Sequence, residues 1–285
     1  MTIPEHQLSS WSSVGAQKGS ADTYASIKHA LNEHEFPSSM TFDVFLQGSY
    51  PNTTNIRGDS DVDIVVQTSE VFYHNVRADQ RSQYGLNTPG DFTLDEFRRE
   101  VLSALKHYYG SDVVRQGNKC IKVAGNQHRL NADVVPCTEY RNYSKPGHYK
   151  VGGIRFLTQN NIEIINYPKV HLANGSEKNK DTDQHYKPNV RVFKNARNRA
   201  GSNFPSYFLE CLLFNVPAER FSASHSETFY DVLSYLVSVR DARLLGAFTC
   251  QNCQQSMFGN KEHQISLIEA EACIEALAQL WDFWR

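Results

Sequence analysis

The stretch Asp61-Val62-Asp63-Ile64-Val65-Val66, with the dipeptide Gly48-Ser49 upstream of it, decides the fold of this chain. Eleven residues separate the two motifs. In a β-strand successive side chains point to opposite faces, so Asp61 and Asp63 share one face and Val62 and Ile64 share the other. Two carboxylates a few ångströms apart repel each other unless a proton or a cation lies between them. The stretch therefore predicts a strand whose acidic face binds a cation.

The cation that fits best is Mg²⁺, which prefers carboxylate oxygens and leaves room for substrate phosphates. The Gly-Ser turn adds backbone N–H groups and a hydroxyl that can bind a phosphate. A calcium loop is one alternative, since Asp59, Asp61, Asp63 and Glu70 occupy its positions one, three, five and twelve, but Ile64 stands where that loop needs glycine. A solvated acidic turn is the other alternative, although acids on an apolar strand need partners.

Composition limits the class of protein. The chain has 285 residues, 40% of them hydrophobic and 21% charged, which suits one large domain or two lobes with a sizeable core. It has no apolar run of eighteen residues and no basic-then-apolar start, so we expect no membrane span, no secretion signal and a cytoplasmic location. A net charge of −2 argues against binding to long nucleic acid.

The six cysteines are scattered along the chain, and we expect them to be reduced thiols. Cys250-Gln-Asn-Cys253 has the spacing of half a zinc site. The other half would have to come from His263 or Cys273, and neither forms a second pair of the usual spacing. Whether Cys250 and Cys253 bind a metal stays open at this point.

The hydrophobic pattern divides the chain into a mixed α/β part, residues 1–174, and a helical part, residues 175–285. In the first part it predicts a helical stretch over 5–34, with a break near Gly15 and Gly19. It predicts a second helix that begins at the capping box Thr93-x-x-Glu96 and ends at Gly110. It predicts strands or extended pieces at 42–46, 61–66, 120–124, 131–135, 162–165 and 170–172. We expect Pro136 to end its strand and residues 140–153 to form a loop. We expect residues 175–187 to form a linker, and the chain from Asn189 onward to form four helices.

A third acid is needed if two metal ions are to support phosphoryl transfer. Asp133 is the best candidate, because it lies on a predicted strand with Ala132 and Val134 on the opposite face. The alternative is a strand-end acid that is hydrogen-bonded to a neighbouring loop.

Together these residues resemble the polymerase-β-like nucleotidyltransferase superfamily, and within it the cGAS/DncV-like nucleotidyltransferases (CD-NTases) of bacterial CBASS anti-phage systems. The resemblance is to clade E, typified by cyclic UMP–AMP synthases, and covers most of the chain. The segments that carry it are Gln47-Gly48-Ser49-Tyr50, Thr54 to Asp63, Ala132-Asp133-Val134-Val135, Lys187 to Arg197, and Pro205-Ser206-Tyr207-Phe208-Leu209-Glu210.

The resemblance implies an α+β fold: a nucleotidyltransferase core of a small mixed sheet with flanking helices, a C-terminal helical lobe, and a nucleotide cleft between them. It implies that two Mg²⁺ ions are held by Asp61, Asp63 and Asp133, with Asp133 helping to activate the acceptor ribose hydroxyl. The residues that it assigns to nucleotide binding are Gln47, Gly48, Ser49, Asn166, Lys194, Ser206 and Tyr207.

Within that set, the resemblance implies that Lys194 and Ser206 contact the donor triphosphate, that Tyr207 stacks on a base and that Asn166 favours a pyrimidine. From the residues alone, Lys194 could equally be a solvated helix lysine, Tyr207 a core residue and Asn166 a turn residue.

The expected activity joins two NTPs, UTP with ATP or UTP, into a cyclic dinucleotide that a downstream effector senses. We expect a monomer. The rival hypotheses are nucleotide addition to an RNA end or to a protein, and a nucleotide-binding module without turnover.

Overall fold

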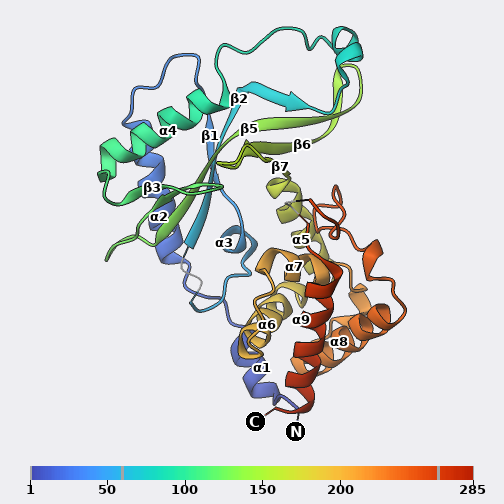
Figure 1. Cartoon of the computed structure of the whole chain (residues 1–285). Coiled ribbons are helices and arrows are strands. Elements are labelled where there is room, and N and C mark those ends of the chain that lie inside the picture. The colour runs from blue at the N-terminus through green and yellow to red at the C-terminus, as the bar shows by residue number, and fades with distance from the viewer. Residues whose placement is uncertain (1, 59–60, 262–263, 285) are drawn as a thin grey trace. The chain divides into compact units, whose positions relative to one another are not determined.

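The computed structural model describes residues 2–58, 61–261 and 264–284 (Figure 1). The chain forms two compact units, and each is built from separate parts of the sequence. Unit 1 comprises Met1–Ala16, Ser49–Asp59 and Val170–Arg285, and unit 2 comprises Gln17–Gly48 and Ser60–Lys169. The expected α+β fold is confirmed. The sequence predicted one boundary between two continuous parts, at residues 174 and 175, and that boundary stays a prediction.

Unit 2 is built on a seven-stranded sheet in which β2 and β5 are the long central pair. These two strands run parallel, and every other pairing is antiparallel. The strand order is β1-β2-β5-β4-β3, and β6 pairs with the second half of β5 and with β7. The strands are β1 (Asp43–Leu46), β2 (Asp61–His74), β3 (Val114–Gln116), β4 (Ile121–Val123), β5 (Asn131–Lys145), β6 (His148–Leu157) and β7 (Glu163–Asn166).

The alternation predicted for β2 is present. Val62, Ile64 and Val66 are fully buried. Helices α2 (Lys18–Asn32) and α4 (Leu94–Tyr109) pack on the sheet, and α4 begins at the predicted capping box and ends before Gly110. The apolar residues on the face shared with the acids, such as Val65 and Val135, instead join a small cluster of residues from the sheet. The helices therefore cover the face opposite to the acids.

Two predictions for β5 and its surroundings were wrong. Pro136 does not end the strand, because it lies where the antiparallel neighbour changes: Val134 is the last partner of β4, and Thr138 the first partner of β6. Proline lacks an N–H donor, and a gap between two neighbouring strands does not need one. Residues 140–153, predicted as a loop, belong to the β5–β6 hairpin. Pro146-Gly147 forms its turn, with φ +70° at Gly147, as proline followed by glycine favours.

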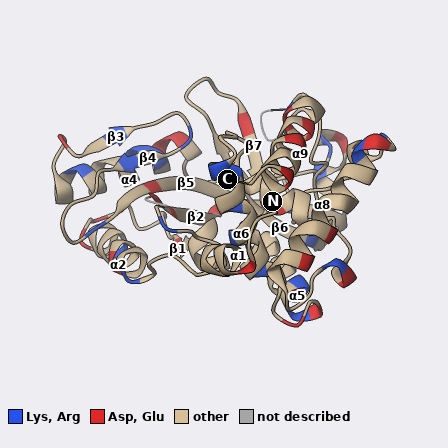
Figure 2. Cartoon of the chain, turned by 90° about the horizontal axis from the view of Figure 1, so that it is seen from below, with Lys and Arg blue, Asp and Glu red and all other residues tan. Residues whose placement is uncertain are grey.

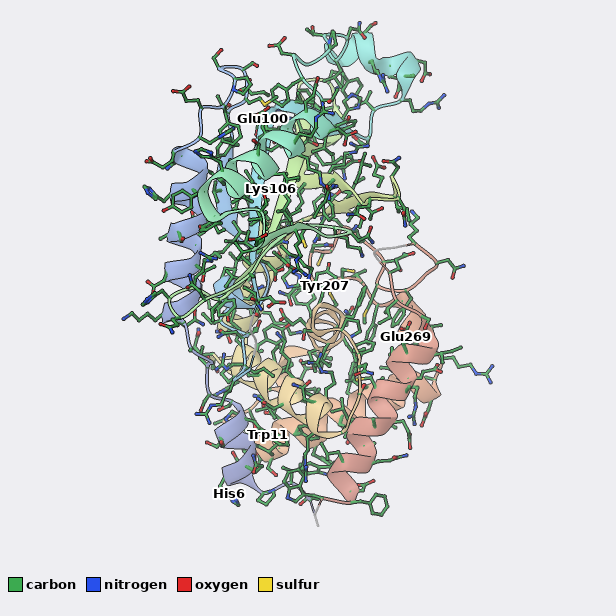
Figure 3. The ribbon with its side chains drawn as sticks, turned by 60° about the vertical axis from the view of Figure 1, so that its left-hand side comes forward. His6, Trp11, Glu100, Lys106, Tyr207 and Glu269 are labelled. Atoms are coloured by element: carbon green, nitrogen blue, oxygen red, sulfur yellow. The ribbon has the colours of Figure 1, made fainter. Side chains whose placement is uncertain are left out.

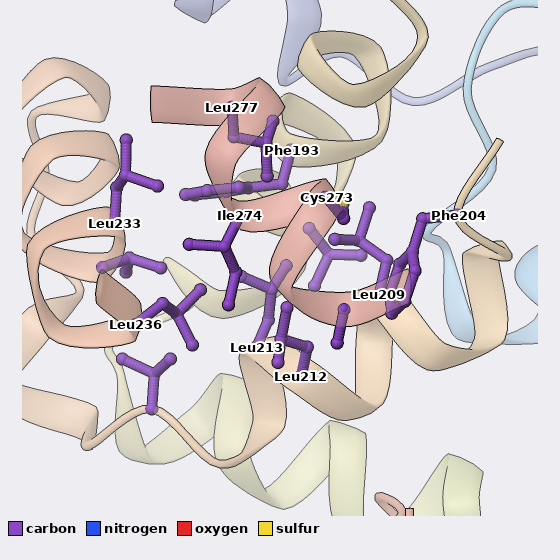
Figure 4. Packing of buried hydrophobic residues seen from close by; sticks show 14 of the residues in the cluster. Phe193, Phe204, Leu209, Leu212, Leu213, Leu233, Leu236, Cys273, Ile274 and Leu277 are labelled. Atoms are coloured by element: carbon purple, nitrogen blue, oxygen red, sulfur yellow. The ribbon is translucent and has the colours of Figure 1, made fainter. Parts of the chain in front are cut away.

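Unit 1 is almost wholly helical, and its core is made of aromatic and leucine side chains (Figure 4). Phe193 stacks on Phe229 at 4.5 Å between ring centroids, and Phe229 stacks on Trp281 at 5.1 Å. Near the N-terminus, Trp11 contacts Trp284 edge to face. The helices are α1 (Glu5–Trp11), α3 (Ser49–Asn52), α5 (Pro168–Asp181), α6 (Tyr186–Arg199), α7 (Ser206–Phe214), α8 (His225–Asp241) and α9 (Leu267–Asp282).

Helix α5 replaces two predicted elements, the extended piece at 170–172 and most of the linker at 175–187. Its polar sequence gives a weak helix pattern, but tertiary contacts fix it. A Cβ on Gly175 would lie 2.3 Å from Nε2 of Gln251, so the glycine permits that close approach. Lys178 donates from Nζ to the carbonyl oxygens of Phe214 and Val216, both at 2.5 Å, and burial lowers its pKa to about 8. None of the described helices is long and apolar enough to cross a membrane.

Candidate active site

The three acidic residues predicted from the sequence lie on the two central strands of unit 2. Asp63 on β2 is the register partner of Asp133 on β5, and Asp61 is the register partner of Asn131. Residues in register on neighbouring strands project to the same face, so all three carboxylates lie on one face of the sheet. The structure therefore brings together the acids that lie seventy residues apart in the sequence.

Asp61 is oriented by a side chain that sequence reasoning missed. The Nδ2 of Asn131 donates to Oδ1 of Asp61 at 3.1 Å. The Oδ1 of Asn131 accepts the N–H of Gly125 at 2.8 Å, which fixes the orientation of the amide. The sequence contains no signal for this pair, because the contact depends on the β2–β5 register.

Gly48 allows the backbone to pass close to Asp63. Its φ is +76°, and a Cβ at this position would lie 2.4 Å from Oδ2 of Asp63. The adjacent Gln47 donates its backbone N–H to the carbonyl oxygen of Asp63 at 2.9 Å. The glycine is therefore required both by the left-handed backbone and by the space that the carboxylate occupies.

Asp133 has a cationic neighbour. Lys122 on β4 is its antiparallel register partner, and Nζ of Lys122 lies 3.6 Å from Oδ1 of Asp133. The carboxylate raises the pKa of Lys122. Asp133 also interacts with Cys120, whose pKa is raised to about 12 by burial and by the negative charge of Asp133. Sequence reasoning missed both neighbours.

The donor set fits a hard divalent ion. Three carboxylates in adjacent positions on one face supply the oxygen ligands that Mg²⁺ prefers. In the described part of the chain no three His, Cys, Asp or Glu side chains are already gathered into a metal cluster. Mg²⁺ does not require such a cage, since it usually binds through one or two carboxylates and substrate phosphates. The calcium-loop and acidic-turn alternatives are contradicted by β2, which begins at Asp61 and extends beyond Glu70 to His74, with a register shift between Thr68 and Phe72. Asp59 lies outside the described residues.

Lys194 lies in unit 1 in a buried network of charges. Only 1% of its side chain is exposed, and its Nζ lies 2.6 Å from Oε1 of Glu210 and donates to the Thr54 carbonyl oxygen at 3.0 Å. Thr54 also donates from its hydroxyl to Glu210 at 2.8 Å, and Nε2 of His171 lies 3.3 Å from the other carboxylate oxygen. This network fixes the segment that contains Thr54 to α6 and α7. The contact of Lys194 with a donor triphosphate stays a prediction.

Glu210 is the charged centre of this network. Burial by itself would raise its pKa, but the Lys194 ammonium and the His171 ring outweigh burial and lower the pKa to about 2. Neither Glu210 nor His171 was assigned a role from the sequence. The sequence has no signal for the pair, because Glu210 lies 39 residues after His171 and the two meet only in the folded unit.

Tyr207 and Ser206, at the start of α7, are held by neighbours within unit 1. The Tyr207 ring stacks on His171 with 5.2 Å between centroids and 24° between planes, and Nδ2 of Asn252 donates to its hydroxyl at 3.3 Å (Figure 3 labels Tyr207). Ser206 accepts from Nη1 of Arg197 at 3.0 Å. Since His171 covers one face of the ring, only the other face can be offered to a base.

Asn166 ends β7. Its Oδ1 accepts the N–H of Tyr167 at 2.8 Å. Gly153 on the neighbouring strand leaves space for this strand end, since a Cβ there would lie 2.7 Å from the Asn166 carbonyl oxygen. Asn166 is paired in register with Ile154, so it is a strand residue rather than the turn residue that was the alternative. The preference for a pyrimidine stays a prediction.

The half zinc site is not completed by the residues that the structure describes. Cys250 is buried and Cys253 is exposed, and Sγ of Cys253 accepts from Nδ2 of Asn174 at 3.6 Å. Cys273 is buried on α9, and His263 lies outside the described residues.

Comparison with known proteins decides the family. The model of the cGAS/DncV-like nucleotidyltransferase C-terminal helical domain matches residues 173–283. The chain is 40% identical to the cyclic UMP-AMP synthase of Rhodothermus marinus, over 100% of this chain and 99% of that protein. This chain belongs to the cGAS/DncV-like nucleotidyltransferases. The resemblance stated from the sequence is confirmed.

Two further comparisons agree with this family. The cyclic dipyrimidine nucleotide synthase CdnE of Cecembia lonarensis is 37% identical to the chain over 75% of each protein. A solved structure of Rhodothermus marinus CdnE c-UMP-AMP synthase with Apcpp and Upnpp covers 99% of this chain and 97% of its own, with a TM-score of 0.91 and 40% identity.

Proposed function

We propose that this nucleotidyltransferase is a cyclic dinucleotide synthase that joins two NTPs with release of pyrophosphate. The observation that carries the proposal is the row of Asp61, Asp63 and Asp133 on one face of the β2–β5 pair, with Gly48 against Asp63. Full-length relatives with cyclic nucleotide synthase activity support it. The product would be a second messenger for anti-phage defence that a separate effector senses.

The three carboxylates would hold two Mg²⁺ ions. When bound, the ions would neutralise phosphate charge and stabilise the attacking and leaving oxygens. Asp133 would accept the proton of the acceptor ribose hydroxyl, whose oxygen forms a bond to the α-phosphorus of the donor. The bond to pyrophosphate breaks in that step. A second attack of the same kind closes the ring, and no covalent enzyme intermediate is needed.

Asn131 and Gly48 would prepare this site before substrate binds. The Asn131 amide holds the Asp61 carboxylate, and Gly48 leaves the Asp63 carboxylate its space. Fixed positions matter because catalysis by charge stabilisation gains most when the groups need not reorganise. We assign Gln47, Gly48, Ser49, Lys194, Ser206 and Tyr207 to nucleotide binding on the family resemblance. A base would stack on the face of the Tyr207 ring that is not stacked on His171.

For the bases, we propose UTP with ATP or with a second UTP. The support is Asn166, whose amide can pair with the edge of uracil, and relatives that are named for cyclic UMP–AMP and for dipyrimidine products.

The test is incubation of the purified protein with labelled NTPs in all pairwise mixtures and Mg²⁺. The expected result is a phosphatase-resistant product whose nuclease fragments and mass identify a cyclic dinucleotide. The variant Asp61→Ala/Asp63→Ala, run in parallel, should give none. A linear tail on RNA or a nucleotidylated protein would instead establish one of the rival activities. Absence of product from every mixture with the wild-type chain would refute the synthase.

A further inference from the structure

Four charged residues form one row across four strands of unit 2. Asp63 on β2 pairs with Asp133 on β5, Asp133 with Lys122 on β4, and Lys122 with Arg115 on β3. Directly opposed residues share a face, so the row reads acid, acid, base, base along one side of the sheet. The basic residues of β3 and β4 are blue in Figure 2. The proposed function uses the two acids of this row and leaves Lys122 without a role.

Lys122 forms an exposed ion pair with Asp133. Its Nζ lies 3.6 Å from Oδ1 of Asp133, while 59% of its side chain is exposed to solvent, against 26% for Asp133. An ammonium on a flexible, exposed side chain can leave its partner for water at small cost. The ion pair is therefore easily broken, unlike the buried pair of Lys194 and Glu210.

The charge of Lys122 matters because Asp63 and Asp133 are neighbours. Two carboxylates in register repel each other when no cation lies near. An ammonium beside Asp133 relieves part of that repulsion in the metal-free protein. A divalent ion at the same carboxylate makes the ammonium unnecessary and repels it.

We propose that Lys122 is a positioning residue that neutralises Asp133 in the metal-free enzyme and competes with the divalent ion for that carboxylate. This inference rests on the proposed function, because it takes Asp133 as a metal ligand. The inference predicts two opposite effects of removing the lysine: metal binding becomes stronger, and the metal-free protein becomes less stable. A lysine with a purely structural role would not improve metal binding when it is lost.

The test measures Mn²⁺ binding by the free-ion signal in electron paramagnetic resonance, and the urea midpoint of unfolding in EDTA. The variants are Lys122→Met and Lys122→Arg. The matched control is Arg115→Met, which removes the same charge one strand farther from the acids. Asp61→Ala/Asp63→Ala measures binding elsewhere on the protein, and that background is subtracted.

For Lys122→Met we expect a Kd for Mn²⁺ about fivefold lower than wild type, because exposed ion pairs are weak and their loss changes equilibria by small factors. Its urea midpoint in EDTA should fall. Lys122→Arg should remain near wild type, and Arg115→Met should change the Kd less than twofold. Weaker or unchanged Mn²⁺ binding by Lys122→Met, or an equal shift in Arg115→Met, would overturn the inference. If the wild-type chain still makes the cyclic product in that case, the proposed function survives without it.

Discussion

Replacement of Gly48 by alanine should lower both the stability and the activity, because two different penalties act at this position. The first is conformational: an alanine held at a φ of +76° costs about 1–2 kcal/mol of folding free energy. The second is local: the new Cβ would lie 2.4 Å from Oδ2 of Asp63, and ordinary van der Waals contact begins at 3.4 Å. The carboxylate oxygen is the end of a side chain that can turn, so we expect it to move by about 1 Å.

A displacement of that size in a catalytic group lowers kcat by about 100-fold. The assay is the initial rate of pyrophosphate release at saturating NTP, together with urea unfolding followed by circular dichroism. The control is Gly147→Ala, whose φ is +70° and whose added Cβ would meet no atom within 4 Å. It should lose similar stability and keep its activity. A wild-type rate in Gly48→Ala, or an equal loss of rate in Gly147→Ala, would refute the reasoning.

Three further predictions concern buried charges and base choice. Glu210→Gln should lower the free energy of unfolding at pH 7 by about 3–5 kcal/mol, measured in urea, because it leaves the Lys194 ammonium buried without its carboxylate partner. Glu210→Leu/Lys194→Met removes both charges and should recover most of that loss. The folded-state pKa of Glu210 is about 2, below its ordinary 4.5, so its stabilisation is full above pH 4.5 and is lost as the pH falls toward 2. A wild-type stability curve that matches the Glu210→Gln curve across that range would contradict this assignment. The folded-state pKa of Lys178 is about 8, below its ordinary 10.5, so the stability should rise with pH between those values. Lys178→Met should remove that rise, measured as the pH dependence of the melting temperature. An identical rise in the variant would exclude Lys178 as its cause. Asn166→Ser should shift incorporation toward purines in an equimolar NTP mixture, measured by mass spectrometry, and an unchanged product ratio would remove Asn166 from base selection.

The strand that carries Asp61 and Asp63 could be predicted from sequence, because alternation of acidic and apolar residues is a local signal. The capping box at Thr93 and Glu96 is equally local, and the structure has it. Asp133 could be proposed as a partner for the same reason. What could not be predicted is its register against Asp63, since strand pairing is decided by the whole sheet.

The errors have the same origin. Proline usually ends a central strand, but Pro136 lies where the neighbouring strand changes, and that place exists only in the folded sheet. Helix α5 has a weak hydrophobic pattern, and contacts such as the close approach of Gln251 to Gly175 stabilise it. Lys194 shows the limit for single residues: its sequence position allowed a solvated or a substrate-facing ammonium, whereas the structure buries it against Glu210.

The mixed origin of unit 1 sets the order in which a growing chain can fold. Its first segment, Met1–Ala16, is synthesised long before the helices with which it packs, as the contact between Trp11 and Trp284 shows. Residues 17–169, which include all of unit 2 and its three acids, emerge before α6 to α9 exist. Domains generally fold as units during synthesis, so the sheet can form while the helical unit still waits for its last helix. The acidic row is thus made before the helical unit, which can be completed only after α9 has been translated.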